Sequence, residues 1–112
     1  MSAAIVHVLP RETAGLLPPH DLDAERALVA CSFHEPRVLE SAAPMVAPGD
    51  FYSDQHARIW RELLSLRAEG GPTGDAPTLI RRLRESASPE TVTYATRIVV
   101  DDTKVTGTVA HA

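Results

Sequence analysis

The sequence is poor in cysteine, in aromatic residues and in long apolar runs, and each shortage excludes a class of protein. Cys31 is the single cysteine, so an intrachain disulfide and a zinc site built on several cysteines are both excluded. The fully apolar runs are only a few residues long, whereas a membrane span needs about 20 residues. The sequence therefore predicts a soluble protein of the reducing cytoplasm, without membrane contact.

The charge balance is acidic, with 11 Lys and Arg against 15 Asp and Glu and a formal net charge of -4. Free-standing nucleic-acid binders need a clustered excess of basic residues, because their phosphate contacts dominate affinity. This balance argues against nucleic acid as the main partner and leaves a local basic patch open. With two Phe, one Trp and two Tyr, the core is expected to be mainly aliphatic.

A chain of 112 residues is long enough for one domain that folds without disulfides. Residues 1–18 carry Pro10, Gly15 and Pro18 among short apolar pieces, and are predicted to form a flexible arm. Residues 19–100 are predicted to form one helical domain. Residues 101–112 show no clear period and are predicted to be a tail.

The first helix is predicted from about residue 22 to residue 33, with Asp21 as its N-cap. Four residues recur at the i, i+3, i+4 and i+7 spacing of one helical stripe: Ala24, Ala27, Leu28 and Cys31. This stripe is expected to face the core. Asp23, Glu25 and Arg26 are expected to face water.

A helix predicted to be the longest and the most central begins at Ser53 or Asp54, extends to about Ala68 and stops at Gly70. Its wide apolar face consists of Ile59, Trp60, Leu63, Leu64 and Leu66.

Three shorter helices complete the prediction. One begins at Pro36 and is ended by Pro44, and another lies around residues 78–84. The last begins after Ser88 and extends to about Val100, where β-branched residues make helix and strand compete. The predicted fold is an all-α orthogonal bundle of four to five short helices around one core.

Several ordered motifs resemble those of a known family. Residues 19–28, PHDLDAERAL, are followed by residues 48–52, PGDFY. Further matching positions are His56, Ile59, Trp60, Leu63, Leu66, Gly71, Pro72, Asp75, Thr78, Leu79 and Leu83. Over residues 18–85 this order resembles the N-terminal domain of DnaB-type replicative helicases. Phe51 and Tyr52 are expected to anchor the core rather than to contact a partner.

The resemblance implies protein–protein contacts in DNA replication, namely helicase assembly, binding of a primase or a helicase loader, and self-association. It fits equally a free-standing relative from a phage or mobile element, or a remnant gene product. The segment after residue 85 looks shorter than in the family, and the C-terminal helical hairpin that pairs family members has no evident counterpart. No Gly-x-x-x-x-Gly-Lys-Ser/Thr phosphate loop occurs, so we expect no ATP hydrolysis, no catalytic residue, no cofactor and no metal.

Arginines form the one notable basic group, which consists of Arg58, Arg61, Arg81, Arg82 and Arg84. The ordinary explanation is a solvated helix face. Contact with an acidic protein surface and contact with nucleic acid are the two functional alternatives. In the second, a small DNA-binding regulator would insert the helix carrying Arg81, Arg82 and Arg84 into a groove, although no stacking aromatic residues accompany the arginines.

A third hypothesis is a small metal-assisted enzyme. Cys31 and His34 have a spacing that places two ligands on one helical face, and Asp50, Asp54 and His56 cluster before the predicted central helix. Two ligands do not make a site, however. The ordinary explanations are a core cysteine, an exposed histidine at a helix end, a capping aspartate and a packed histidine.

Overall fold

The computed structural model describes the backbone of residues 21–111 and the side chains of residues 21–100. Its elements in chain order are α2 (Leu22–His34), α3 (Pro36–Ala42), the 3-10 turn η2 (Pro48–Asp50), α4 (Asp54–Glu69), α5 (Ala76–Ser86) and α6 (Pro89–His111). The described residues contain no strand, which confirms the all-α prediction. The predicted arm of residues 1–18 lies outside the described residues.

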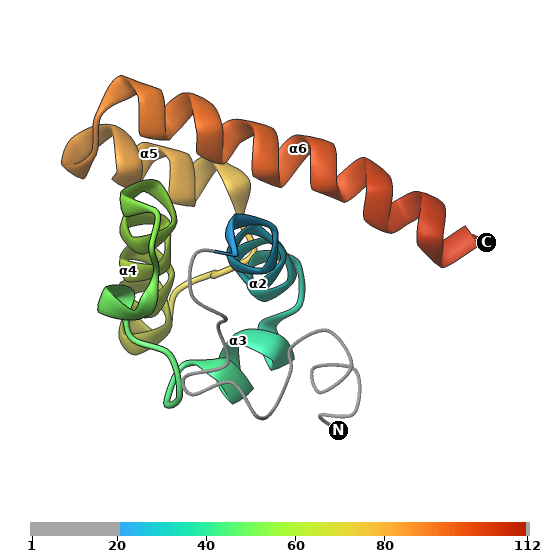
Figure 1. Ribbon diagram of the computed structural model, residues 1–112, viewed down its shortest axis with the longest axis horizontal. Helices are drawn as coiled ribbons and strands as arrows, with labels where there is room; N and C mark the ends of the chain where they lie inside the picture. Colours follow the sequence, from blue (N-terminus) through green and yellow to red (C-terminus); the bar gives the residue numbers. More distant parts are fainter. Residues whose placement is uncertain (1–20, 112) are drawn as a thin grey trace.

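One helix crosses a pair of neighbouring helices, as the prediction of an orthogonal bundle required. Figure 1 shows α5 and α6 side by side, with α4 running across their direction beneath them. Helix α2 packs against α3, α4 and α6, and α4 also packs against η2, α5 and α6. Helix α4 is therefore central, as predicted.

Helix α2 begins where the sequence predicts, because the Asp21 carboxylate accepts the Ala24 N–H at 2.9 Å. Its buried side is different from the predicted stripe and consists of Glu25, Leu28, Val29, Ala30, Ser32 and Phe33. Ala24, Ala27 and Cys31 are only half-buried. The stripe prediction is thus confirmed only at Leu28, because three other helices cover α2. Glu25, expected to face water, is 1% exposed.

Helix α4 has the ends that its sequence predicts. The Ser53 hydroxyl accepts the His56 N–H at 3.2 Å, and the helix ends at Gly70, which has a φ of 75°. This left-handed conformation favours glycine because a Cβ would clash with the backbone. In that turn Gly71 N donates to the Leu66 carbonyl at 2.9 Å.

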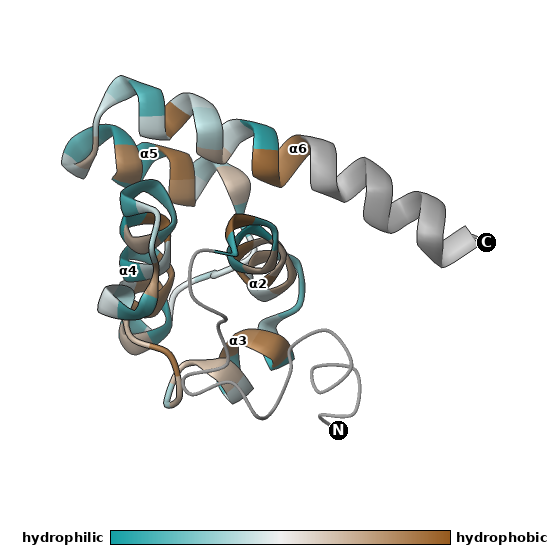
Figure 2. Cartoon of the chain, in the orientation of Figure 1, coloured by the Kyte–Doolittle hydropathy of each residue, from teal (hydrophilic) through white to brown (hydrophobic). Residues whose placement is uncertain are grey.

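Trp60 lies at the centre of the core and is fully buried. Its indole Nε1 donates to the Val46 carbonyl at 2.9 Å, which joins α4 to the segment after α3. In Figure 2, brown and teal residues alternate around α4 and α5, as expected for helices with one buried and one exposed side. Phe51 is buried as predicted, but Tyr52 is 61% exposed, so its predicted core role was wrong. Two neighbours in an extended segment point to opposite sides.

Helix α6 is longer than predicted. It has 23 residues against 16 in α4, so α4 is not the longest helix, and α6 continues beyond Val100 to His111. No proline follows Pro89, and β-branched residues lower helix propensity by only a few tenths of a kcal/mol each, about 0.7 at most, too little to end a helix already begun. The backbone of residues 101–111 continues α6 as a helix. The assignment of these residues to a tail outside the domain stays a prediction.

Candidate functional site

A buried polar cluster connects α2, α4 and α6, and we call Glu25, His56 and Tyr94 the polar centre. The Nδ1 atom of His56 lies 2.9 Å from Glu25 Oε1, and its Nε2 lies 2.6 Å from the Tyr94 hydroxyl. Glu25 and His56 are 1% and 2% exposed. One residue from each of the three helices thus meets in the interior.

The Glu25 carboxylate is also bound by backbone. Its Oε2 accepts the Tyr52 N–H at 2.5 Å, and its Oε1 accepts the Ser53 N–H at 3.1 Å. These N–H groups precede the first turn of α4, where the helix dipole stabilises negative charge. A buried carboxylate is tolerated only when its oxygens are satisfied in this way. Glu25 therefore fixes the start of α4 against α2.

The geometry assigns the polar centre to structure rather than to catalysis. Nδ1 of His56 donates to the Glu25 carboxylate, and in the neutral ring Nε2 accepts from the Tyr94 hydroxyl. Both ring nitrogens thus have protein partners. A general base must lie within hydrogen-bonding reach of the proton it takes from a substrate. The Glu25 and His56 side chains are enclosed by the core, where no substrate reaches them.

The residues suggested for a metal-assisted enzyme do not come together. Asp50 Oδ2 accepts the Ala47 N–H at 2.8 Å and so caps η2, Asp54 is exposed, and His56 lies inside the polar centre. Cys31 and His34 are both half-buried, so neither the core cysteine nor the exposed histidine was predicted fully. Among the described side chains, no group of three His, Cys, Asp or Glu residues gathers as a metal ion would require.

The predicted arginine group divides into three parts, of which the first is Arg82. Its guanidinium donates to Glu62 at 3.1 Å, to Glu69 at 2.8 Å and to the Ser65 hydroxyl at 2.9 Å. We call these four residues the arginine cluster. Hydrogen bonds from Arg82 and then from Ser65 lower the pKa of Glu69, and the hydrogen bonds to Glu69 and Glu62 raise the pKa of Arg82. Arg82 therefore connects α5 to α4 instead of extending into solvent.

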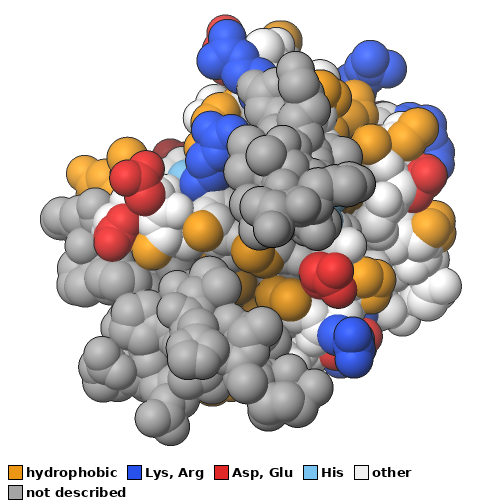
Figure 3. Space-filling view, turned by 90° about the vertical axis from the view of Figure 1, so that its right-hand side faces the viewer, with side chains coloured by type: hydrophobic (Ala, Val, Ile, Leu, Met, Phe, Trp, Pro, Cys, Tyr) orange, Lys and Arg blue, Asp and Glu red, His pale blue; other side chains and the backbone are white. Residues whose placement is uncertain are grey.

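Arg81 and Arg84 form the second part, and both are exposed on α5. Neither forms an ion pair with a residue whose side chain the structure describes. In the face shown in Figure 3, basic and acidic side chains are interspersed around apolar ones, without a continuous basic stripe among the described residues.

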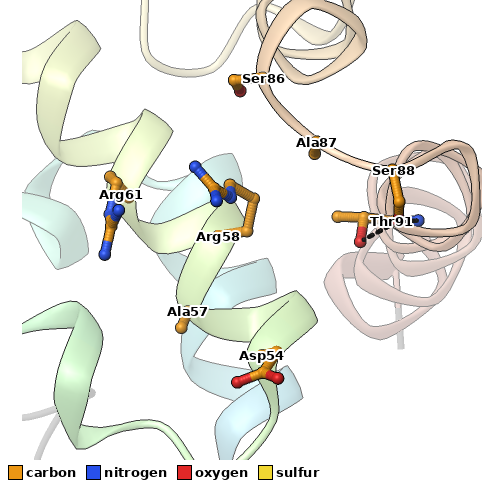
Figure 4. Close-up of a pocket in the computed structure, with 8 residues that line it drawn as sticks. All are labelled: Asp54, Ala57, Arg58, Arg61, Ser86, Ala87, Ser88 and Thr91. Atoms are coloured by element: carbon orange, nitrogen blue, oxygen red, sulfur yellow. Dashed lines mark hydrogen bonds between the residues drawn. The ribbon is translucent and has the colours of Figure 1, made fainter.

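Arg58 and Arg61 are the third part, and they line a hollow of about 410 Å³ between α4 and the start of α6. The other lining residues are Asp54, Ala57, Ser86, Ala87, Ser88 and Thr91. Figure 4 shows the two arginines on α4, with Arg58 nearer the turn from α5 to α6 and the Arg61 side chain directed away from that turn. The Ser88 hydroxyl accepts the Thr91 N–H at 3.2 Å and so caps α6 beside that turn.

Sequence reasoning found the arginines of this hollow but missed its second wall. Ser86, Ala87 and Thr91 carry no motif, and only the Ser88–Pro89 helix start placed a turn there. It also missed Glu25 as a buried residue, although the signal was available, because Glu25 and His56 both belong to the motifs of the resembled family.

No helix in the described part of the chain is long and apolar enough to cross a membrane.

Comparison with known proteins gives a family match over residues 17–112, to the model described as the DnaB-like helicase N terminal domain. The match extends beyond the resemblance over residues 18–85 and includes α6. The sequence after residue 85 shows no evident counterpart of the family's C-terminal helical hairpin. In the structure this segment contains one long helix, and it belongs to the matched region.

Curated relatives agree with this match. The chain is 34% identical over 74 residues to the replicative DNA helicase DnaB of Treponema pallidum (strain Nichols), covering 66% of this chain and 17% of the relative. It is 36% identical over 56 residues to the replicative DNA helicase DnaC of Bacillus subtilis (strain 168), covering 50% of this chain and 12% of that relative. For the replicative DNA helicase DnaB of Pasteurella multocida (strain Pm70), the identity is 33% over 78 residues, covering 70% of this chain and 16% of that relative. The matched region is thus less than a fifth of each relative. No solved structure matches the chain significantly.

Proposed function

Because the chain belongs to the family of DnaB-like helicase N-terminal domains, we propose that it is a non-catalytic interaction module of DNA replication. Its role would be helicase assembly, or contact with a primase or a helicase loader, and self-association through the same fold. The proposal assigns no catalytic residue and no cofactor. Such a role places the chain in the cytoplasm.

The observation that carries the proposal is the display of Tyr52. Its side chain is 61% exposed, while its backbone N–H is held by the buried Glu25 carboxylate. Tyrosine on a fixed backbone is a typical anchor of protein interfaces, because it offers a large amphipathic surface with little conformational entropy to lose. The large exposed apolar side chains of Leu22 and Val100 add further contact surface.

Light scattering after size-exclusion chromatography tests this proposal. The purified chain is run alone and mixed with the replicative helicase and the primase of the same source. We expect a co-eluting complex with one of them, and the mass of the chain alone reports self-association. Elution as an inert monomer beside both proteins would contradict the interaction role.

The Tyr52→Ala variant identifies the surface used. We expect it to weaken the complex by about tenfold or more, as the loss of an interface anchor does. Met45→Ala removes a side chain of similar exposure from the segment after α3, and serves as the matched control. Equal losses in the two variants would mean that Tyr52 has no special place in the interface.

The DNA-binding alternative receives less support. Of its three arginines, Arg82 is held by Glu62 and Glu69, so only Arg81 and Arg84 extend from α5 toward solvent. Steeply salt-dependent DNA affinity that is lost in Arg81→Ala and Arg84→Ala would favour this alternative.

A further inference from the structure

We propose that the hollow between α4 and the start of α6 binds an acidic segment of a protein partner, through Arg58 and Arg61. The inference rests on the proposed interaction role and names the chemistry that one partner must present. Aspartate or glutamate side chains of a peptide would pair with the two guanidinium groups.

The two arginines are placed to act together. They stand three residues apart on α4, so they lie on one side of the helix about one turn apart. Both line the same hollow of about 410 Å³, which is within the range of pockets that bind small ligands or a few side chains. Figure 4 shows Ser88, which precedes α6, and Thr91, on the first turn of α6, across the gap from Arg58.

Charge pairing in the rest of α4 leaves these two arginines available. Farther along the helix, Arg67 binds both Glu40 carboxylate oxygens at 3.0 Å. Glu62 and Glu69 bind Arg82. Arg58 and Arg61, by contrast, form no ion pair with any described side chain. An arginine without an internal partner keeps its forked set of donors for a carboxylate from outside.

The lining as a whole favours a carboxylate ligand. It contains two arginines and one acidic residue, Asp54, so its formal charge is +1. The hydroxyls of Ser86 and Ser88 supply additional hydrogen-bonding groups on the other wall. The N-terminal end of α6 adds a modest positive potential there.

A short acidic peptide fits this lining better than nucleic acid does. Single-stranded nucleic acid is bound by stacking aromatics along an extended basic groove, and the lining contains no aromatic side chain. Two arginines match two carboxylates of a peptide instead.

An NMR titration of the nitrogen-15-labelled chain with a hexaglutamate peptide tests the site. We expect shifts of the Arg58 and Arg61 side-chain Nε–H signals and of the Ser88 and Thr91 amides, with binding that weakens as salt is added. Arg58→Glu combined with Arg61→Glu should weaken binding by about tenfold or more. The single variant Arg61→Glu, at an exposed position, should give a smaller loss and guards against misfolding.

The combination of Arg81→Glu with Arg84→Glu is the matched control, since it makes the same charge change on another exposed helix face. We expect it to keep peptide binding within about twofold of the unmodified chain. Equal losses in both double variants, or the largest shifts at Arg81 and Arg84, would show general attraction of anions and overturn the proposal. Tighter binding of a hexathymidylate oligonucleotide at the hollow would overturn it in favour of nucleic acid.

Failure of the inference and failure of the proposed function are distinguishable. A helicase or primase complex that the Arg58 and Arg61 double variant leaves intact would overturn the hollow as a docking site and leave the interaction role standing. Peptide binding at the hollow in a chain that forms no complex with either protein would support the site and overturn the replication role.

Discussion

The polar centre and the arginine cluster each join glutamate, a nitrogen-containing side chain and a hydroxyl by hydrogen bonds. They differ in how far their side chains are exposed to water. In the polar centre, Glu25 and His56 are almost fully buried. In the arginine cluster, the Arg82 and Glu69 side chains are 25% and 54% exposed. Buried polar groups that lose a partner cannot turn to water, whereas exposed ones can. The two clusters therefore differ in the effect of losing one member more than in their number of hydrogen bonds.

The largest effect is expected from Glu25→Ala. It leaves the Tyr52 and Ser53 N–H groups and the His56 ring without their buried acceptor. Breaking such a pair from one side costs about 3–5 kcal/mol of unfolding free energy. Urea denaturation followed by circular dichroism measures this loss. Glu25→Gln keeps one acceptor oxygen and should lose less unfolding free energy. If Glu25→Ala lost less than about 1 kcal/mol, the polar centre would contribute no more than a weak surface ion pair.

Tyr94→Phe should give the second largest effect. It removes only the hydroxyl that binds His56 Nε2, and leaves the ring in place. Loss of one partner of a buried hydrogen bond costs about 1–3 kcal/mol. Thermal unfolding of this variant is compared with that of Thr96→Val, which removes an exposed hydroxyl from the same helix. Similar stabilities of the two variants would show that the Tyr94 hydroxyl contributes nothing beyond a surface hydrogen bond.

Arg82→Met is expected to destabilise the protein less than either substitution in the polar centre. Glu69 loses its partner but is 54% exposed to water, and Glu62, which is 12% exposed, keeps the hydrogen bond from the Ser86 hydroxyl at 2.9 Å. The methionine retains much of the aliphatic packing. The difference from the unmodified protein should shrink in high salt, because exposed charges are screened. Urea denaturation at low and high salt measures it. A loss that exceeds that of Tyr94→Phe would contradict the comparison.

The smallest effect is the pH dependence contributed by Glu69. Arg82 holds its pKa below the ordinary value of 4.5, so the unfolded chain takes up this proton first as the pH falls. The stabilisation is therefore complete above the ordinary value and is lost as the pH falls through the lowered pKa. Glu69→Gln should be less stable than the unmodified protein at neutral pH, and the difference should disappear in acid. A difference that persists in acid would mean that it does not come from this charge.

The features that the sequence predicted correctly are local. Asp21, Ser53 and Ser88 each accept the N–H of the residue three positions later, so each helix start is determined by a few neighbouring residues. Gly70 ends α4 for an equally local reason. These signals were sufficient for an all-α fold and for these three helix starts.

The features that were not predicted from the sequence depend on residues far apart along the chain. Glu25 was assigned to water from its charge, because its partners are 27 to 31 residues away. Arg82 was grouped with its neighbours in sequence, although its carboxylates lie 13 and 20 residues earlier. The hollow combines α4 with the turn after α5, and no local sequence pattern predicts it. Pairing between helices is set by packing, which the helical period alone does not specify.

The separation of the polar centre along the chain has a consequence for its synthesis. Tyr94 follows His56 by 38 residues, which a ribosome adds in about two to eight seconds at about 5–20 residues per second. During that interval α2 and α4 exist without the hydroxyl that completes the buried histidine, and without Ile98 and Val99, which cover the core. The nascent chain therefore becomes a closed domain only when α6 has emerged, and a translational pause before Pro89 would leave an open core for chaperones to protect.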